Sequence, residues 1–111
     1  MDIEREQQGD VTIVKLGGRF DSAAAPAAET QLGGALGTGA AHLAIDMSGL
    51  EYISSAGLRV LLVLARKVQQ GAGKVALFGL APNVREVFTV SGLDTILSIQ
   101  PDAAAALAHV R

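Results

Sequence analysis

The sequence predicts a single α/β domain over residues 1–111, built on a mixed sheet of four to five strands with helices mainly on one face. From Leu43 onward, short apolar runs alternate with helical segments, and βα units of this kind force parallel strand pairing. Before Leu43, Gly9-Asp10 joins two strand-like segments, which predicts an antiparallel hairpin. The length of 111 residues and the 50% hydrophobic composition suit one continuous core.

The hairpin and the first helix follow from local composition. The β-branched stretch from Val11 to Leu16 predicts the second strand, which we expect to end at Gly17-Gly18. The Ala-rich run from Ala23 to Leu36 predicts a helix, with Pro26 in the first turn, where proline is tolerated. Because glycines weaken the end of this helix, we expect it to fray into the loop Gly37-Thr38-Gly39.

The central strand and helix have the clearest periodicity. The apolar run from His42 to Met47 predicts a short strand buried on both faces, followed by a turn at Ser48-Gly49. The segment from Ala56 to Gln70 predicts an amphipathic helix that ends at Gly71. Its apolar positions recur at intervals of three and four: Leu58, Leu61, Leu62, Ala65 and Val68.

The remaining elements complete the alternation of strand and helix. Lys74 to Phe78 predicts a third buried strand. Pro82 begins a helix that Gly92 ends. Ile96 to Ile99 predicts a short strand, and Pro101-Asp102 opens a last helix.

Composition excludes whole classes of function. Without Cys, disulfides, thiolate zinc sites and cysteine nucleophiles are impossible, and His42 and His109 are too isolated for a metal site. The net charge is −2 and the longest basic run is Arg66-Lys67, so the chain lacks the stripe of basic residues that nucleic-acid binding needs.

No stretch resembles a signal peptide or a membrane span, so we expect a cytoplasmic protein without a membrane partner. The sequence also lacks a phosphate-binding loop and a catalytic constellation, and we expect neither a cofactor nor an enzyme.

The segment from Asp46 to Arg59 carries the densest local signal. It joins a buried strand to the strongest predicted helix, and Ser54 and Ser55 lie just before that helix. A serine oxygen at this place can accept a hydrogen bond from the free N–H groups of the first turn. A phosphoryl group would meet the same donors and the positive end of the helix dipole. Both serines are therefore candidates for capping or for phosphorylation.

The stretch from Asp46 to Leu62 resembles the signature of STAS domains, specifically the bacterial anti-sigma-factor antagonists, in which a strand ending in Asp-x-Ser leads to Ser-x-Gly-Leu at a helix start. Gly18-Arg19-Phe20-Asp21 is similar to the family's segment after the hairpin. Val84-Arg85-Glu86-Val87-Phe88 with Ser91-Gly92-Leu93 is similar to its late helix and turn. These pieces follow the family's order over most of the chain, and the resemblance implies a STAS-like fold.

The resemblance also implies a function. Such antagonists bind a serine kinase that is itself the anti-sigma factor; phosphorylation prevents binding, and a serine phosphatase of the PP2C type reverses it. Many members read Asp-Ser-Ser-Gly where this chain reads Ser54-Ser55-Ala56-Gly57, so Ala56 replaces the usual acceptor. We therefore expect Ser55 as the phosphorylated residue, with Ser54 as the second choice.

A partner surface is predicted around this helix start. Helical projection places Val60 and Val63 on the outer side of the helix beside basic residues, which indicates a contact surface. Asp21 and Asp46 either flank the acceptor or form turns. The predicted partner-binding residues are Asp21, Asp46, Gly57, Leu58, Arg59, Val60, Val63 and Arg66.

Two other functions remain as alternatives. Ala56 at the usual acceptor position favours a constitutive STAS subunit that docks on a transporter ATPase or another signalling complex. A small-ligand or nucleotide-binding module, or a minor enzyme, is the other alternative, but the sequence lacks the cluster of polar residues that such a site needs.

Overall fold

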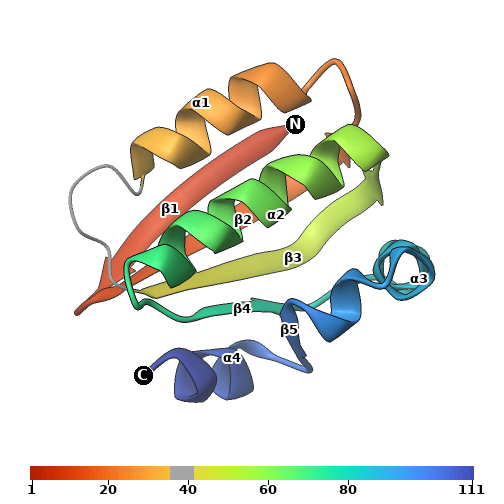
Figure 1. Cartoon of the computed structure of the whole chain (residues 1–111). Helices are drawn as coiled ribbons and strands as arrows, with labels where there is room; N and C mark the ends of the chain where they lie inside the picture. The colour runs from red at the N-terminus through yellow and green to blue at the C-terminus, as the bar shows by residue number, and fades with distance from the viewer. Residues whose placement is uncertain (36–41) are drawn as a thin grey trace.

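The structure, a computed structural model, describes residues 1–35 and 42–111. Five strands form one sheet in the order β1-β2-β3-β4-β5. β1 and β2 pair antiparallel around the turn at Gly9, and every later neighbour pairs parallel, which confirms the predicted mixed sheet (Figure 1). The strands are β1 (Asp2–Gln8), β2 (Val11–Phe20), β3 (His42–Ile53), β4 (Val75–Phe78) and β5 (Ser98–Gln100).

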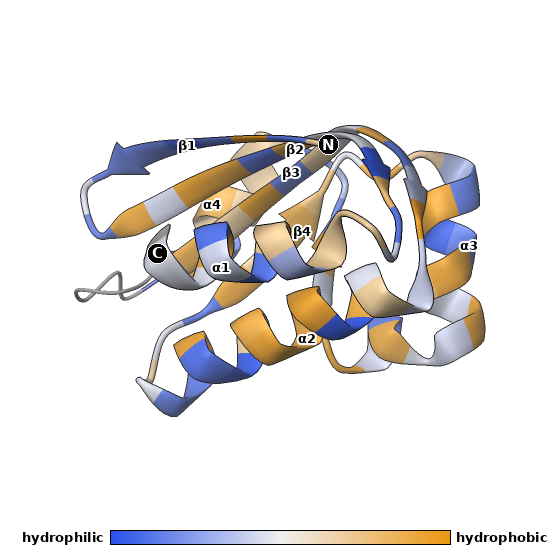
Figure 2. Ribbon diagram, turned by 90° about the horizontal axis from the view of Figure 1, so that it is seen from above, coloured by the Kyte–Doolittle hydropathy of each residue, from blue (hydrophilic) through white to orange (hydrophobic). Residues whose placement is uncertain are grey.

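Helices cover the sheet unequally. α1, α2 and α3 pack on one face, and α4 packs against β4 and β3 on the other, so helices lie mainly on one face as predicted. Figure 2 shows hydrophobic and hydrophilic residues alternating along α2, as an amphipathic helix requires. The helices are α1 (Ala25–Ala35), α2 (Ser55–Gln70), α3 (Pro82–Ser91) and α4 (Ala103–Val110), with a short 3-10 turn at Leu93–Thr95.

Strand alternation divides the core into two layers. Successive side chains of a strand point to opposite faces, so the apolar runs of β3 and β4 supply both layers. The layer under α1, α2 and α3 contains Leu43, Ile45, Met47, Val75 and Leu77. The layer under α4 contains Val11, Ala44, Ala76, Phe78, Ala106 and Val110. This double burial explains why these strands are continuous apolar runs in the sequence.

Two strands are longer than predicted. β2 does not end at Gly17-Gly18 but continues to Phe20, and β3 runs through the expected turn at Ser48-Gly49 to Ile53. The two strands stay paired across register shifts between Lys15 and Gly17 and between Gly18 and Arg19. These glycines therefore mark bulges rather than strand ends. The extension carries Phe20 and Ile53 under the start of α2.

The helix boundaries follow the sequence more closely. α1 has Pro26 in its first turn as predicted, whereas the expected loop Gly37-Thr38-Gly39 lies outside the described residues. α2 begins at Ser55, and α3 begins at Pro82 and ends at Gly92, whose φ of 77° is the left-handed conformation that glycine adopts at helix ends. The last strand is shifted from the predicted 96–99 to 98–100.

Candidate functional site

The end of β2 meets the start of α2. The backbone N–H of Ser54 donates to the carbonyl oxygen of Phe20 at 2.9 Å, and the Ser54 Oγ donates to the same oxygen at 3.0 Å. The Ser54 Oγ also accepts from the backbone N–H of Gly57 at 3.2 Å, so Ser54 is the N-cap of α2. The half-buried hydroxyl of Ser54 thus makes one hydrogen bond as donor and one as acceptor.

Ser55, the next residue, has a different environment. It is the first residue of α2 and is exposed. Within the part of the chain that the structure describes, its Oγ makes no hydrogen bond to the protein, whereas Ser54 makes two. The structure therefore distinguishes the two serines: Ser54 holds the helix start in place, and Ser55 presents a free hydroxyl to solvent.

Gly57 lets α2 lie close to the sheet. A Cβ atom at this position would come within 2.9 Å of the Ile53 Cγ1 and of the Phe20 ring, closer than real Cβ atoms approach. Both of these side chains are buried, so neither can move away freely. A residue without a side chain at Gly57 is what allows Ser55 to be held at a fixed place above the ends of β2 and β3.

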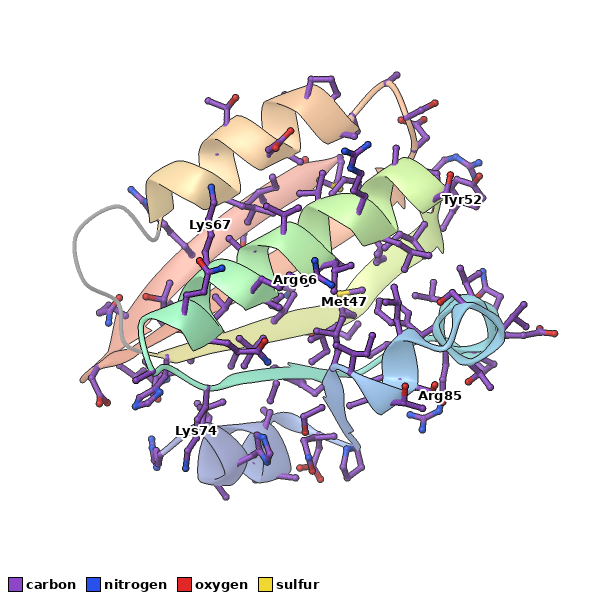
Figure 3. All side chains as sticks on the ribbon, viewed as in Figure 1. Met47, Tyr52, Arg66, Lys67, Lys74 and Arg85 are labelled. Carbon is purple, nitrogen blue, oxygen red and sulfur yellow. The ribbon has the colours of Figure 1, made fainter. Side chains whose placement is uncertain are left out.

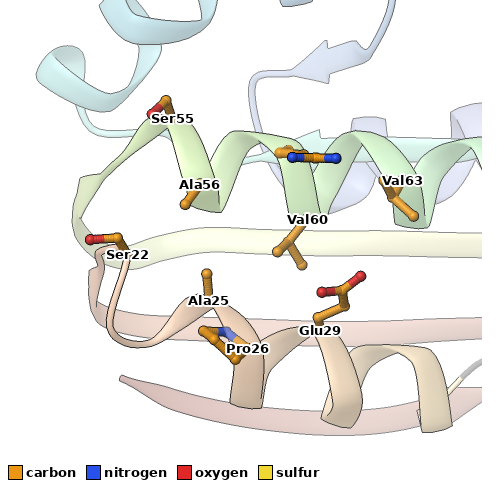
Figure 4. Close-up of a pocket in the computed structure, with 9 residues that line it drawn as sticks. Ser22, Ala25, Pro26, Glu29, Ser55, Ala56, Val60 and Val63 are labelled. Carbon is orange, nitrogen blue, oxygen red and sulfur yellow. The ribbon is translucent and has the colours of Figure 1, made fainter.

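A groove of about 770 Å³ runs between the first turns of α1 and α2, and Ser55 lines it. Figure 4 shows Ser22 and Ser55 at the same end of the groove and Val60 directed from α2 toward α1. The wall from the α1 side consists of Ser22, Ala25, Pro26 and Glu29, and the α2 side contributes Ser55, Ala56, Arg59, Val60 and Val63. The groove therefore combines apolar side chains, one cation, one anion and two hydroxyl groups.

The structure corrects the predicted outer face of α2. Val60 is only 7% exposed and belongs to the core, so the prediction that it faces outward is wrong. The helical projection considered α2 alone, whereas α1 packs beside it and covers Val60. Gly57 and Leu58 are buried too, while Val63 is half-buried in the groove wall.

Basic residues of α2 remain accessible. Arg59 and Arg66 are both exposed, as a partner-binding role requires. Arg59 lines the groove beside Ser55, whereas Arg66 lies further along the helix together with Lys67 (Figure 3). The predicted partner-binding residues of α2 therefore fall into a buried group that shapes the helix start and an exposed group that can touch another protein.

The two predicted aspartates lie in different places. The Asp21 Oδ1 accepts from the backbone N–H of Ala24 at 2.9 Å and turns the chain into α1, next to the junction of Phe20 and Ser54. The Asp46 Oδ1 accepts from both the N–H and the Oγ of Ser48, at 2.9 and 2.6 Å.

Asp46 does not flank the serines. Its strand alternates so that Asp46 shares a face with Ala44, in the layer under α4, whereas α2 covers the opposite face. Neither interpretation given to Asp46 fits its place: it lies within β3, which continues past Ser48 without a turn, and on the sheet face opposite α2.

Sequence reasoning missed the α1 side of the groove. Ser22, Pro26 and Glu29 become part of the site only because α1 packs against α2. The one available signal was the run of small residues that includes Ala25 and Ala28, both buried, because small side chains let two helices approach closely.

Another unpredicted contact is the Arg19 guanidinium over the Tyr52 ring, 4.4 Å from its centroid.

Within residues 1–35 and 42–111, no three acidic or histidine side chains are grouped as metal ligands would be. None of the helices in that same part of the chain has both the length and the apolar character to cross a bilayer.

Comparison with known proteins agrees with the geometry. A family model described as STAS domain matches residues 2–106. BtrV of Bordetella bronchiseptica, named as a candidate anti-sigma factor antagonist, is 36% identical over 108 residues, which are 97% of this chain and 93% of BtrV.

Solved structures share the fold. An anti-sigma factor antagonist from Mycobacterium paratuberculosis superposes with a TM-score of 0.91 and 28% identity, covering 99% of this chain and 93% of its own. The Bacillus cell fate determinant SpoIIAA in its phosphorylated form superposes with a TM-score of 0.71 over 91% of this chain and 93% of SpoIIAA, at 22% identity. The helix start built on Ser54 and Gly57, the five-stranded mixed sheet and the match over residues 2–106 lead to one conclusion: this chain belongs to the STAS domain family.

Proposed function

We propose that this protein is an anti-sigma-factor antagonist that binds a serine-kinase anti-sigma factor and loses that binding when Ser55 is phosphorylated. The observation that carries the proposal is the free, exposed hydroxyl of Ser55 at the start of α2, beside a groove with apolar walls. The names of BtrV and of the Mycobacterium relative support the antagonist role. The proposal places the protein in the cytoplasm, with neither nucleic acid nor a membrane as partner.

Ser55 is a better phosphoacceptor than Ser54. A phosphoryl group on the Ser54 Oγ would remove the donor to the Phe20 carbonyl oxygen and crowd the bond from Gly57, so α2 would lose its N-cap. The Ser55 Oγ has no such role, and its modification leaves the cap intact. The positive end of the helix dipole and the remaining free N–H groups of the first turn favour a dianion there.

Phosphorylation at Ser55 also has a physical reason to block binding. The groove walls beside it include Pro26, which is exposed, and Val63, which is half-buried, and both offer apolar contact to a partner side chain. A phosphate of about −2 charge at the edge of this groove must be stripped of water if a partner covers it. The partner therefore binds the unmodified groove and is rejected by the modified one.

The chemistry itself belongs to the partners. The kinase brings ATP and Mg²⁺; the Ser55 Oγ attacks the γ-phosphorus, the bond to ADP breaks, and a base of the kinase takes the hydroxyl proton. A PP2C-type phosphatase returns the hydroxyl by hydrolysis of the phosphoester. This chain supplies the acceptor and the docking surface, and it is not an enzyme in this proposal.

The test measures binding and modification together. The purified protein is mixed with the cognate serine-kinase anti-sigma factor and ATP-Mg²⁺, and fragment mass spectrometry locates the phosphate, which we expect on Ser55. By calorimetry, Ser55→Ala should bind the kinase as wild type does, and Ser55→Asp should bind at least about tenfold more weakly. Thr89→Asp, which adds the same charge at an exposed position of α3, is the control. Undiminished binding by Ser55→Asp would contradict the switch.

One observation favours a second function. By the resemblance to the family pattern Asp-Ser-Ser-Gly, Ala56 stands where an acceptor serine is expected, as a constitutive STAS subunit docking on a transporter ATPase or another signalling complex would allow. In that case the same experiment gives no phosphate on any serine, and Ser55→Ala and Ser55→Asp bind their partner equally well.

A further inference from the structure

Arg59 lies one helical turn after Ser55. Residues four apart on a helix are neighbours on one face, and an anion placed before a cation at this spacing is the favourable order. Both residues line the groove between α1 and α2, and both are exposed. Among the side chains that the structure describes, Arg59 takes part in no ion pair, so its guanidinium is free in the unmodified protein.

Two other cations, Arg66 and Arg19, are badly placed to reach Ser55. Arg66 is eleven residues further along α2, about 16 Å at 1.5 Å per residue. Arg19 packs over Tyr52, and both alternate with Phe20 and Ile53, the buried side chains beneath α2, so they belong to the opposite face of the sheet. Within the described lining of the groove, Arg59 is the one cation.

The charge on the opposite wall of the groove favours one position for the phosphate. Glu29 of α1 lines the same groove and carries a negative charge, so it repels a phosphate on Ser55. The phosphate is thereby favoured on the α2 side of the groove, where Arg59 lies. A guanidinium also matches phosphate geometry with two parallel N–H donors, which an ammonium group does not offer.

We propose that the Arg59 guanidinium binds the phosphate on Ser55 and forms an ion pair with it along the first turns of α2. This rests on the proposed phosphorylation of Ser55. In the unmodified protein the Arg59 guanidinium is available to a carboxylate of the partner at the rim of the groove. Once Ser55 is phosphorylated, the same guanidinium is occupied by the protein's own phosphate. Modification then removes a cation from the docking surface in addition to adding an anion.

The test needs no kinase. Phosphoserine is introduced at position 55 during translation by an expanded genetic code, and its ³¹P chemical shift is followed against pH. Because a nearby cation favours the dianion, the second pKa of the phosphate, about 6 for phosphoserine, should rise by about 0.4 in Arg59→Gln. Arg59→Lys keeps the charge without the planar fork, and its phosphate should titrate between these two proteins.

Arg66→Gln is the matched control. It removes the same charge from the same helix at about 16 Å from Ser55, where screening at physiological ionic strength leaves little interaction. Its phosphate should titrate as in the protein with both arginines. Equal titration curves for Arg59→Gln and Arg66→Gln would overturn the ion pair. The two experiments are independent. Equal titration curves would not change the result expected for kinase binding, and failure of the kinase to modify Ser55 would not change the result expected for this titration.

Discussion

The hydroxyl of Ser54 and the backbone of Gly57 are joined by a hydrogen bond of 3.2 Å, in which the Gly57 N–H donates to the Ser54 Oγ. Because Ser54 also donates to the Phe20 carbonyl oxygen, it links the end of β2 to the first turn of α2. Ser55 takes no part in this link. Two adjacent serines with the same chemistry therefore have different roles, one in stability and one in exposure of a hydroxyl.

Ser54→Ala should destabilise the protein by about 1 kcal/mol, because an N-cap hydrogen bond is lost and the Phe20 carbonyl oxygen loses a donor. Ser55→Ala is the neighbouring control and should change stability by less than about 0.5 kcal/mol, since its hydroxyl is exposed. Urea unfolding of the three proteins followed by circular dichroism measures both differences. Equal losses for the two variants would refute the division of roles.

Gly57→Ala should cost about 1–3 kcal/mol, because the new methyl group overlaps the buried Phe20 ring and Ile53 and must push α2 from the sheet. Gly34→Ala is the opposite case: nothing lies within 4 Å of its Cβ position, and the residue is in α1. That variant should gain up to about 1 kcal/mol from helix propensity. Thermal unfolding of both variants distinguishes close packing at Gly57 from a general effect of replacing glycine.

Val60→Ala tests the corrected face of α2. Removing two buried methyl groups should cost about 1.5 kcal/mol, because Val60 lies in the core between α2 and α1. Val63→Ala, at a half-buried position one turn away, should cost less than about 1 kcal/mol. Urea midpoints give the comparison. A Val60→Ala protein as stable as wild type would mean that the residue faces solvent, as the helical projection suggested.

Local sequence signals predicted the order of the elements well. Gly9 in the hairpin turn, Pro26 and Pro82 in first helical turns and Gly92 at a helix end all act through their own backbone, so each could be recognised without knowing the neighbours. The start of α2 was predicted within one residue for the same reason, because the Ser54 cap is local.

Features that depend on neighbouring elements were not predictable in this way. Gly17-Gly18 has the composition of a strand end, yet β2 continues because β3 runs beside it and its register shifts allow the bulges. Val60 has the position of an outer residue on an isolated helix, and only α1 makes it part of the core. The groove beside Ser55 was unpredictable for the same reason, because Glu29 and Pro26 line it only through the packing of α1 against α2.

Substitutions of Asp46 test whether this residue stabilises the fold or binds the partner. Asp46→Ala removes the acceptor of two hydrogen bonds from Ser48 and should cost about 1–2 kcal/mol, whereas Asp46→Asn keeps an oxygen acceptor and should cost less. Affinity for the anti-sigma factor should stay within about twofold for both variants, because Asp46 lies on the sheet face opposite α2. Urea unfolding and calorimetric titration of the same samples measure the two effects. Weaker binding by Asp46→Asn at unchanged stability would place the partner on the α4 face of the sheet and remove the groove from the interface.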